Sequence, residues 1–228
     1  MKKIGMIVAV EMDALHKRYG AADETVEKAG FQILIYHKPT FDLFVLESKA
    51  GEIAATAATQ LLISAYEVDL IVNFGVVGGL TDAISKHRIC VVEDVVHYDF
   101  DTSAVDNCEV GRYLDQPSVY IPTTKTLVDF VTQQFPNVVP VRCASGDKFI
   151  AEAQQKAAMH EKFQADICEM EAAGIVITCQ RNHIPCLLIK MVADGIEGGA
   201  EEFWQEKERS SMVCLETLDA VLESYTLQ

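Results

Sequence analysis

Acidic residues gather in one stretch of the sequence, residues 166–194, which reads DICEMEAAGIVITCQRNHIPCLLIKMVAD. Glu169 and Glu171 stand just before a helical pattern, and in an extended backbone they would point to the same side. Asp194 follows the next apolar run, and open α/β sheets place their ligand sites at the carboxyl ends of strands. If these two strands are sheet neighbours, three carboxylates converge on one crevice.

Each motif also has an ordinary structural explanation. Acids just before a helix often cap its free N–H groups and complement its dipole. An Asp-Gly pair after a strand, as at Asp194 and Gly195, is often only a turn. Taken alone, each motif fits the structural and the functional interpretation about equally well, so the choice depends on the rest of the chain.

The composition excludes several classes of function. The chain has 228 residues, half of them hydrophobic, which suits one α/β domain with a full core. Its formal net charge of −15 disfavours nucleic acid and anionic membrane partners, because both require a basic surface. The seven cysteines form no CxxC pair, which disfavours a metal site and indicates reduced thiols in a cytoplasmic protein. We expect neither a signal peptide nor a membrane span.

Strands alternate with helices along the chain. This order predicts a single domain over residues 1–228, an α/β fold with a central sheet and helices around it. A hairpin over residues 31–48 would make the sheet mixed rather than purely parallel. The other expected strands are 3–10, 69–74, 88–97, 139–144 and 186–192, and the expected helices are 13–19, 51–66, 123–135, 151–163, 172–181 and 201–225. The region 103–122 has no periodicity, and we expect it to serve as a lid or a subunit contact.

Two glycine-containing turns follow predicted strands. Glycines between Gly75 and Leu80 allow backbone N–H groups to approach a ligand closely. This turn lacks both the dinucleotide-binding spacing and the lysine of a P-loop, so neither NAD nor ATP is expected and no cofactor is predicted. Phe149 follows the second turn, where its ring could stack on an aromatic ligand or simply pack in the core.

Taken together, these motifs resemble the 5′-methylthioadenosine/S-adenosylhomocysteine nucleosidases of the nucleoside phosphorylase superfamily. The resemblance runs in order along nearly the whole chain. It is carried by Gly5 with Val8-Ala9-Val10-Glu11-Met12-Asp13, by Asn73-Phe74-Gly75-Val76-Val77-Gly78-Gly79-Leu80, by Ser145-Gly146-Asp147-Lys148-Phe149-Ile150, by Glu169-Met170-Glu171-Ala172 and by Ala193-Asp194. It implies a three-layer αβα sandwich around a mixed, barrel-like sheet, a homodimer, no metal and hydrolysis of the bond between a purine and a ribose derivative.

The resemblance also implies a role for each matching residue. At the base, Asp194 would protonate N7 of the leaving purine, Phe149 would stack on the ring, the backbone of Ile150 would read its edge, and Gly78 would lie beside it. At the sugar, Glu171 would hold the ribose hydroxyls and Met170 would pack under the ring. Asp13 falls where the family has the glutamate that activates water. Phe203 and a partner's loop 98–105 would lie near the 5′ substituent.

These roles agree with the chemistry of the reaction. A purine leaves poorly as an anion and the sugar becomes cationic, so the site needs an acid, nearby carboxylates and a base for water. For Asp194 to act as the acid near neutral pH, burial or the neighbouring Glu169 and Glu171 must raise its pKa.

Four positions depart from the family pattern around the water. They are Asp13 in place of glutamate, Val76 in place of a serine or threonine, Lys190 in place of arginine, and Ala193 in place of a serine or threonine. Lys190 loses the bidentate geometry of a guanidinium. Besides a 5′-thioadenosine nucleosidase, the sequence therefore leaves open a phosphorylase and a catalytically impaired nucleoside-binding protein.

Overall fold

Strand β5 (Leu70–Gly79) is at the centre of the fold, and every one of its residues is buried. Its almost wholly apolar sequence is typical of a strand that is covered on both faces. The strand extends through the glycines that the sequence indicated as a turn, because these residues continue to pair with the strands on either side. The computed structural model describes residues 1–84 and 88–226.

The strands form one mixed sheet that closes on itself. Its order is β10-β6-β8-β9-β5-β1-β4-β3-β2, and an additional pairing of β10 with β5 closes a five-stranded barrel. Strands β1, β4, β3 and β2 extend the sheet outward from β5, and β7 pairs with β6. This arrangement confirms the predicted mixed, barrel-like fold. The bounds are β1 Lys2–Val8, β2 Glu24–Lys28, β3 Phe31–His37, β4 Phe41–Glu47, β6 Ile89–His97, β7 Ile121–Pro122, β8 Val139–Ser145, β9 Ile167–Glu169 and β10 Cys186–Asp194.

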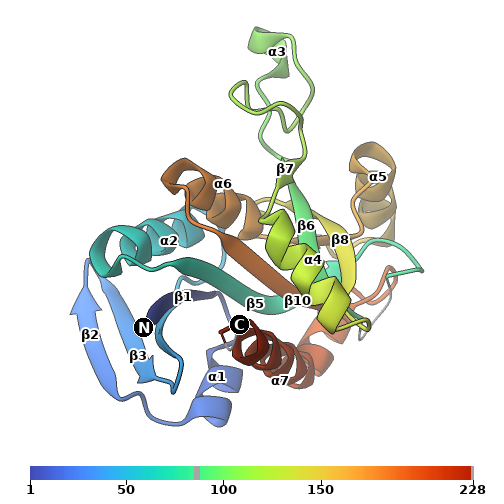
Figure 1. The fold of residues 1–228 in the computed structure, drawn as a ribbon. Coiled ribbons are helices and arrows are strands. Elements are labelled where there is room, and N and C mark those ends of the chain that lie inside the picture. Colours follow the sequence, from blue (N-terminus) through green and yellow to red (C-terminus); the bar gives the residue numbers. More distant parts are fainter. Residues whose placement is uncertain (85–87, 227–228) are drawn as a thin grey trace.

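Helices cover the sheet from two sides. One apolar cluster unites the sheet with α2 and α6, and another unites it with α1, α4 and α7. Figure 1 shows α2 beside α6, with α7 on the other side of the sheet. The bounds are α1 Met12–Tyr19, α2 Glu52–Tyr66, α3 Ser103–Asp106, α4 Lys125–Gln134, α5 Ala153–Phe163, α6 Ala172–Asn182 and α7 Gly199–Thr226.

Two segments differ from the sequence-based expectations. β2 reads ETVEK and is mostly exposed, so it lacks the apolar alternation that would have revealed it, and it pairs only as the outer neighbour of β3. The region 103–122 contains the short helix α3 and the two-residue strand β7, and Figure 1 shows the α3 part of it extending away from the sheet. In the described part of the chain, none of the helices has the length and hydrophobicity that a membrane span requires.

Candidate functional site

The acidic strand ends meet through β5. Gly78 pairs with Cys168 of β9 and also with Asp194 of β10. In the sheet, β9 lies between β8 and β5, whereas β10 lies between β6 and β5. The two acid-bearing strands are therefore not direct neighbours, although direct pairing was the condition set for the three carboxylates to converge. Their ends converge nevertheless, because both flank the same end of β5.

A cavity of about 250 Å³ opens beside these strand ends. It is lined by Ala9, Val10, Glu11, Ala50, Val76, Val77, Gly78, Phe149, Cys168, Glu169, Met170, Glu171, Phe203, Trp204 and Lys207. An adjoining space of about 30 Å³ shares several of these residues and adds Lys148, Ile150 and Asp194. The fold thus brings nine of the eleven predicted site residues to the two spaces; Asp13 and Lys190 are not among the lining residues.

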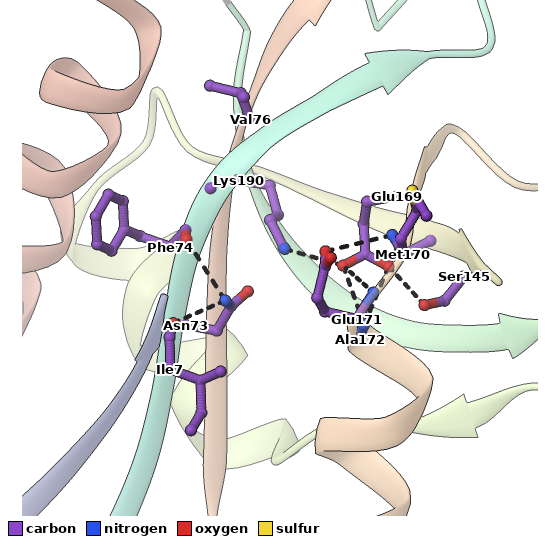
Figure 2. Close-up of polar contacts among 12 residues, drawn as sticks. Ile7, Asn73, Phe74, Val76, Ser145, Glu169, Met170, Glu171, Ala172 and Lys190 are labelled. Atoms are coloured by element: carbon purple, nitrogen blue, oxygen red, sulfur yellow. Dashed lines mark hydrogen bonds and ion pairs between the residues drawn. The ribbon is translucent and has the colours of Figure 1, made fainter. Parts of the chain in front are cut away.

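Glu169 is the charged centre of the site. Figure 2 shows Lys190 and Ser145 reaching its carboxylate from opposite sides, at 3.1 Å from Lys190 Nζ and 2.6 Å from Ser145 Oγ. Burial by itself would raise the pKa of Glu169, but Lys190 and the hydrogen bonds bring that pKa below its ordinary value. Burial likewise opposes the charge of Lys190, yet Glu169 and Glu171 raise the lysine pKa well above its ordinary value. The two side chains form a buried ion pair.

Glu169 also caps helix α6. Its carboxylate accepts the backbone N–H of Ala172 at 3.0 and 3.1 Å to its two oxygens, and that of Glu171 at 3.2 Å. The structural explanation for an acid before a helix therefore holds for Glu169. Because the Glu169 carboxylate binds both Lys190 and the N-terminus of α6, it holds in place the segment that carries Glu171.

Glu171 lines the cavity with a carboxyl group that has fewer partners. Its Oε1 accepts the backbone N–H of Gly51 at 3.0 Å. Burial, reinforced by the charge of Glu169, raises the pKa of Glu171 to about 8. Glu171 can therefore carry a proton near neutral pH and both donate and accept hydrogen bonds toward a polyhydroxylated ligand.

Asp194 is almost completely buried and forms an ion pair that the sequence did not reveal. Lys156 Nζ, on α5, donates to Asp194 Oδ2 at 2.5 Å and to the carbonyl of Gly195 at 2.6 Å. Among the described residues, Asp194 Oδ1 has no hydrogen-bond partner. Burial raises the pKa of Asp194 above its ordinary value although Lys156 lowers it, so the two effects oppose each other at this carboxyl.

Glu11 lies at the cavity in the place where the sequence comparison led us to expect Asp13. Glu11 is 3% exposed, and its two oxygens accept the backbone N–H of Val76 at 3.0 Å and that of Val10 at 2.9 Å. Asp13 lies in the exposed first turn of α1, which begins at Met12. Asp13 therefore does not line the cavity, because the turn into α1 directs Glu11 inward and Asp13 outward.

The end of β5 lets two carboxylates approach the backbone closely. A Cβ atom on Gly75 would lie 2.9 Å from Glu11 Oε1, and a Cβ on Gly78 would lie 3.3 Å from Asp194 Oδ2. Any side chain at Gly75 would therefore displace the Glu11 carboxylate. Val76 contributes its N–H to the site, and its apolar side chain adds no hydrogen bond there.

Aromatic rings border the opposite wall of the cavity. Phe149 is 41% exposed and contacts Phe203 edge-on, with their ring centroids 5.3 Å apart. The alternative of simple core packing does not fit such an exposed ring. Ile150, by contrast, is buried, and Met170 lies on the segment between Glu169 and Glu171. A flat ligand placed over Phe149 would lie next to Asp194.

Sequence reasoning missed two buried charged residues, Lys156 and Glu52. Lys156 precedes Met159 and Phe163 by three and seven positions, so helical spacing puts all three on the buried face of α5. A lysine on that face is the signal by which the sequence could have revealed it. Burial and Glu169 raise the pKa of Glu52 to about 8. Ser145 Oγ lies between the carboxyls of Glu52 and Glu169. Since a hydroxyl has one proton to donate, a protonated Glu52 satisfies this arrangement.

Comparison with known proteins agrees with this geometry. A sequence profile of the phosphorylase superfamily matches residues 3–226. The chain belongs to the phosphorylase superfamily. It is 31% identical to a 5′-methylthioadenosine/S-adenosylhomocysteine nucleosidase of Shewanella sp. (strain MR-7) over 201 residues, which cover 84% of each protein. It is 29% identical to a nucleosidase of the same description from Shewanella loihica over 199 residues, or 84% of this chain and 86% of the relative.

Solved structures within this superfamily share the fold. The Helicobacter pylori 5′-methylthioadenosine/S-adenosylhomocysteine nucleosidase aligns with a TM-score of 0.92 at 23% identity, covering 98% of both chains. A futalosine hydrolase mutant of Helicobacter pylori aligns with a TM-score of 0.90 at 23% identity, covering 98% of this chain and 100% of the other. Structural similarity at this identity establishes the phosphorylase-superfamily fold and leaves the substrate open.

Proposed function

We propose that this protein is a nucleosidase that hydrolyses the N-glycosidic bond of a 5′-substituted adenine nucleoside, 5′-methylthioadenosine or S-adenosylhomocysteine, to adenine and a ribose derivative. The observation that carries this proposal is that Glu11 and Glu171 line the cavity, that Asp194 lines the adjoining space, and that Phe149 lines both. The names of the most similar curated relatives support the choice of substrate.

The base end of the site suits a leaving purine. Phe149 offers an exposed ring face for stacking, and Ile150 brings its backbone to the edge of the base. Asp194 transfers its proton to N7 while the bond between C1′ and N9 breaks, so the purine departs as a neutral molecule. Desolvation of Asp194 favours the protonated form that this step requires.

The sugar end of the site suits a cationic ribosyl group and an attacking water. Glu171 binds the ribose hydroxyls, Met170 packs under the ring, and the nearby carboxylates stabilise the positive charge that develops on the sugar. Glu11 accepts a proton from water as the new bond between oxygen and C1′ forms. The N–H groups of Val76 and Val10 hold the Glu11 carboxylate in place for this step.

This geometry gives little support to the two alternatives, a catalytically impaired nucleoside-binding protein and a phosphorylase. The alternative of an impaired binding protein rested on the altered water site, at Asp13, Val76, Lys190 and Ala193. The inward position of Glu11 supplies a full-length glutamate carboxylate where the shorter Asp13 was expected. A phosphorylase would bring phosphate next to Glu11 and Glu171, and Lys190 is already engaged by Glu169. Repulsion between phosphate and the Glu11 carboxylate favours water as the nucleophile.

Release of free base tests the proposal directly. Purified protein is incubated with 5′-methylthioadenosine, S-adenosylhomocysteine, adenosine, inosine and futalosine, each with and without phosphate. We expect adenine from the first two substrates without phosphate, and a rate at least about a hundredfold lower for Asp194→Asn, because its general acid is removed. Release that requires phosphate would identify a phosphorylase. Binding without release would identify a nucleoside-binding protein, and a preference for futalosine would assign a different substrate.

We also propose that the protein is a homodimer formed through the α2 and α6 side. A groove of about 470 Å³ lies there, lined by Glu52, Ile53, Thr56, Ala57, His97, Tyr113, Gly174, Ile177, Thr178 and Arg181. Ile53 is 83% exposed and lines this groove, so it offers an apolar side chain to a partner subunit. The resemblance to homodimeric nucleosidases supports this assignment and the expectation that loop 98–105 reaches the partner's site.

A further inference from the structure

Lys156 and Asp194 form an ion pair in the interior of the protein, 0% and 1% exposed at their side chains. A lysine in such surroundings is costly unless it has strong partners. Lys156 has two, Asp194 Oδ2 and the carbonyl of Gly195, which is the residue that follows Asp194. Helix α5 thus places a positive charge against Oδ2 of Asp194, the carboxyl group that we propose as the proton donor.

The two oxygens of Asp194 have different surroundings. Oδ2 accepts from Lys156, whereas Oδ1 has no partner among the described residues. Asp194 also lines the small space next to the cavity, together with Gly78, Phe149 and Ile150. A buried carboxylate oxygen without a donor is unfavourable, so this oxygen is suited to a hydrogen-bonding atom of a ligand.

The geometry points to Lys156 as the positioning residue of Asp194: it holds the carboxyl group through Oδ2, leaves Oδ1 for the purine, and controls the pH range over which Asp194 can donate a proton. This inference rests on the proposed nucleosidase function. It assigns to the reaction a residue outside the predicted site and outside the residues that line the cavity.

Lys156 affects both sides of the proton transfer. Before transfer its charge favours the ionised form of Asp194 and so opposes protonation. After transfer the same charge stabilises the carboxylate that remains when N7 has taken the proton, and Asp194 regains a proton from solvent. Two other groups act on this carboxyl. Glu202 of α7 raises its pKa and accepts the N–H of Gly195 at 2.8 Å, while the Cys168 thiol of β9 lies across Gly78.

The test compares the pH dependence of kcat/KM in Lys156→Met, Lys156→Gln and the parent protein. Glutamine keeps an N–H donor without the charge, and Lys162→Met, at an exposed position of the same helix, is the matched control. Because removal of a neighbouring cation raises the pKa of a carboxyl group, we expect the basic limb to move upward by about one pH unit or more in both Lys156 variants. Lys156→Gln should retain more activity at low pH than Lys156→Met.

An unchanged basic limb in both variants, with lower activity at every pH, would overturn the proposal and leave Lys156 a purely structural role. Circular dichroism checks the folding of each variant, and Lys156→Gln carries the test if the methionine variant does not fold. Titration of the Asp194 carboxyl by ¹³C NMR, assigned with Asp194→Asn, needs no substrate. A higher midpoint in Lys156→Gln supports the proposal even if the parent protein releases no base, whereas an unchanged midpoint rejects it.

Discussion

Two carboxylates two positions apart differ completely in their surroundings at the start of α1. Glu11 is buried against the β5 backbone, and Asp13 is exposed. We expect Glu11→Gln to lower kcat/KM for 5′-methylthioadenosine by about 10²–10⁴, because general-base catalysis typically contributes that factor. Base release under identical conditions measures the loss.

Asp13→Asn is the matched control for this prediction. Since Asp13 is exposed, its substitution should change neither stability nor turnover appreciably. An equal loss of activity in both variants, or a loss confined to Asp13→Asn, would show that the water position lies closer to α1 than the Glu11 contacts indicate.

Helices α2 and α6 pack so closely at Gly174 that no side chain fits there. A Cβ atom at this position would lie 2.5 Å from Thr56 Oγ1 and 2.7 Å from the carbonyl oxygen of Glu52. Gly174→Ala should therefore destabilise the protein by about 1–3 kcal/mol despite the better helix propensity of alanine. A lower Tm in differential scanning calorimetry is the expected result.

A substitution at an exposed position in another helix measures the effect of helix propensity on stability by itself. Gln155→Ala in α5 also introduces alanine but leaves the packing between helices unchanged. It should leave the Tm unchanged or raise it slightly. A Tm that is equally unaffected in Gly174→Ala would mean that α2 and α6 can separate without cost.

The junction of α2 and α6 also contains a pH-sensitive group. Burial raises the pKa of Glu52 from its ordinary value of 4.5 to about 8, so the folded state retains a proton that the unfolded chain releases. The stability that this proton provides is complete below about pH 4.5 and is lost as the pH rises through about 8. Above pH 8 the charged Glu52 repels Glu169.

Glu52→Gln should remove this part of the pH dependence, because glutamine resembles the protonated acid and carries no charge. We expect the variant to exceed the parent protein in Tm by at least about 2–4 °C at pH 8.5, which corresponds to roughly 1 kcal/mol for a protein of this size. The difference should become small near pH 5. A constant difference across this range would contradict a protonated Glu52.

At the scale of the whole molecule, the proposed dimer depends on the exposed side of α2 and α6. Ile53→Glu would place a charge where an apolar contact is expected. We expect this variant to dissociate to monomers at concentrations at which the parent protein is dimeric, as measured by light scattering after size exclusion. Gln133→Glu, at an exposed position of α4 in the other helical layer, should leave the assembly unchanged.

Assembly and activity can be compared in the same variants. If loop 98–105 contributes to the partner's site, Ile53→Glu should raise the KM for 5′-methylthioadenosine more than it lowers kcat, because the affected contacts lie at the 5′ substituent. A monomeric parent protein with full activity would reject both the dimer and the shared site.

Much of this protein follows from the sequence itself. The buried strand 69–74 with the glycines after it, the run from Glu169 to Glu171, and Asp194 after the last strand are local patterns. Backbone periodicity places them at strand ends without knowledge of the rest of the chain. The order of these motifs indicated the superfamily and the mixed barrel. Nine of the eleven predicted site residues line the cavity or the adjoining space, whereas their roles remain proposals.

The tertiary structure decided the features that depend on distant contacts. The barrel closes through β10 and β5, a pairing between segments about a hundred residues apart that no local pattern reveals. The direction of the turn before α1 placed Glu11 inward and Asp13 outward, a difference that spacing alone could not settle. Lys156 meets Asp194 only because the fold brings this side chain of α5 to the end of β10. The pKa values of the site residues depend on burial and on neighbouring charges. Because three-dimensional packing sets both, only the tertiary structure decides which of these residues are protonated.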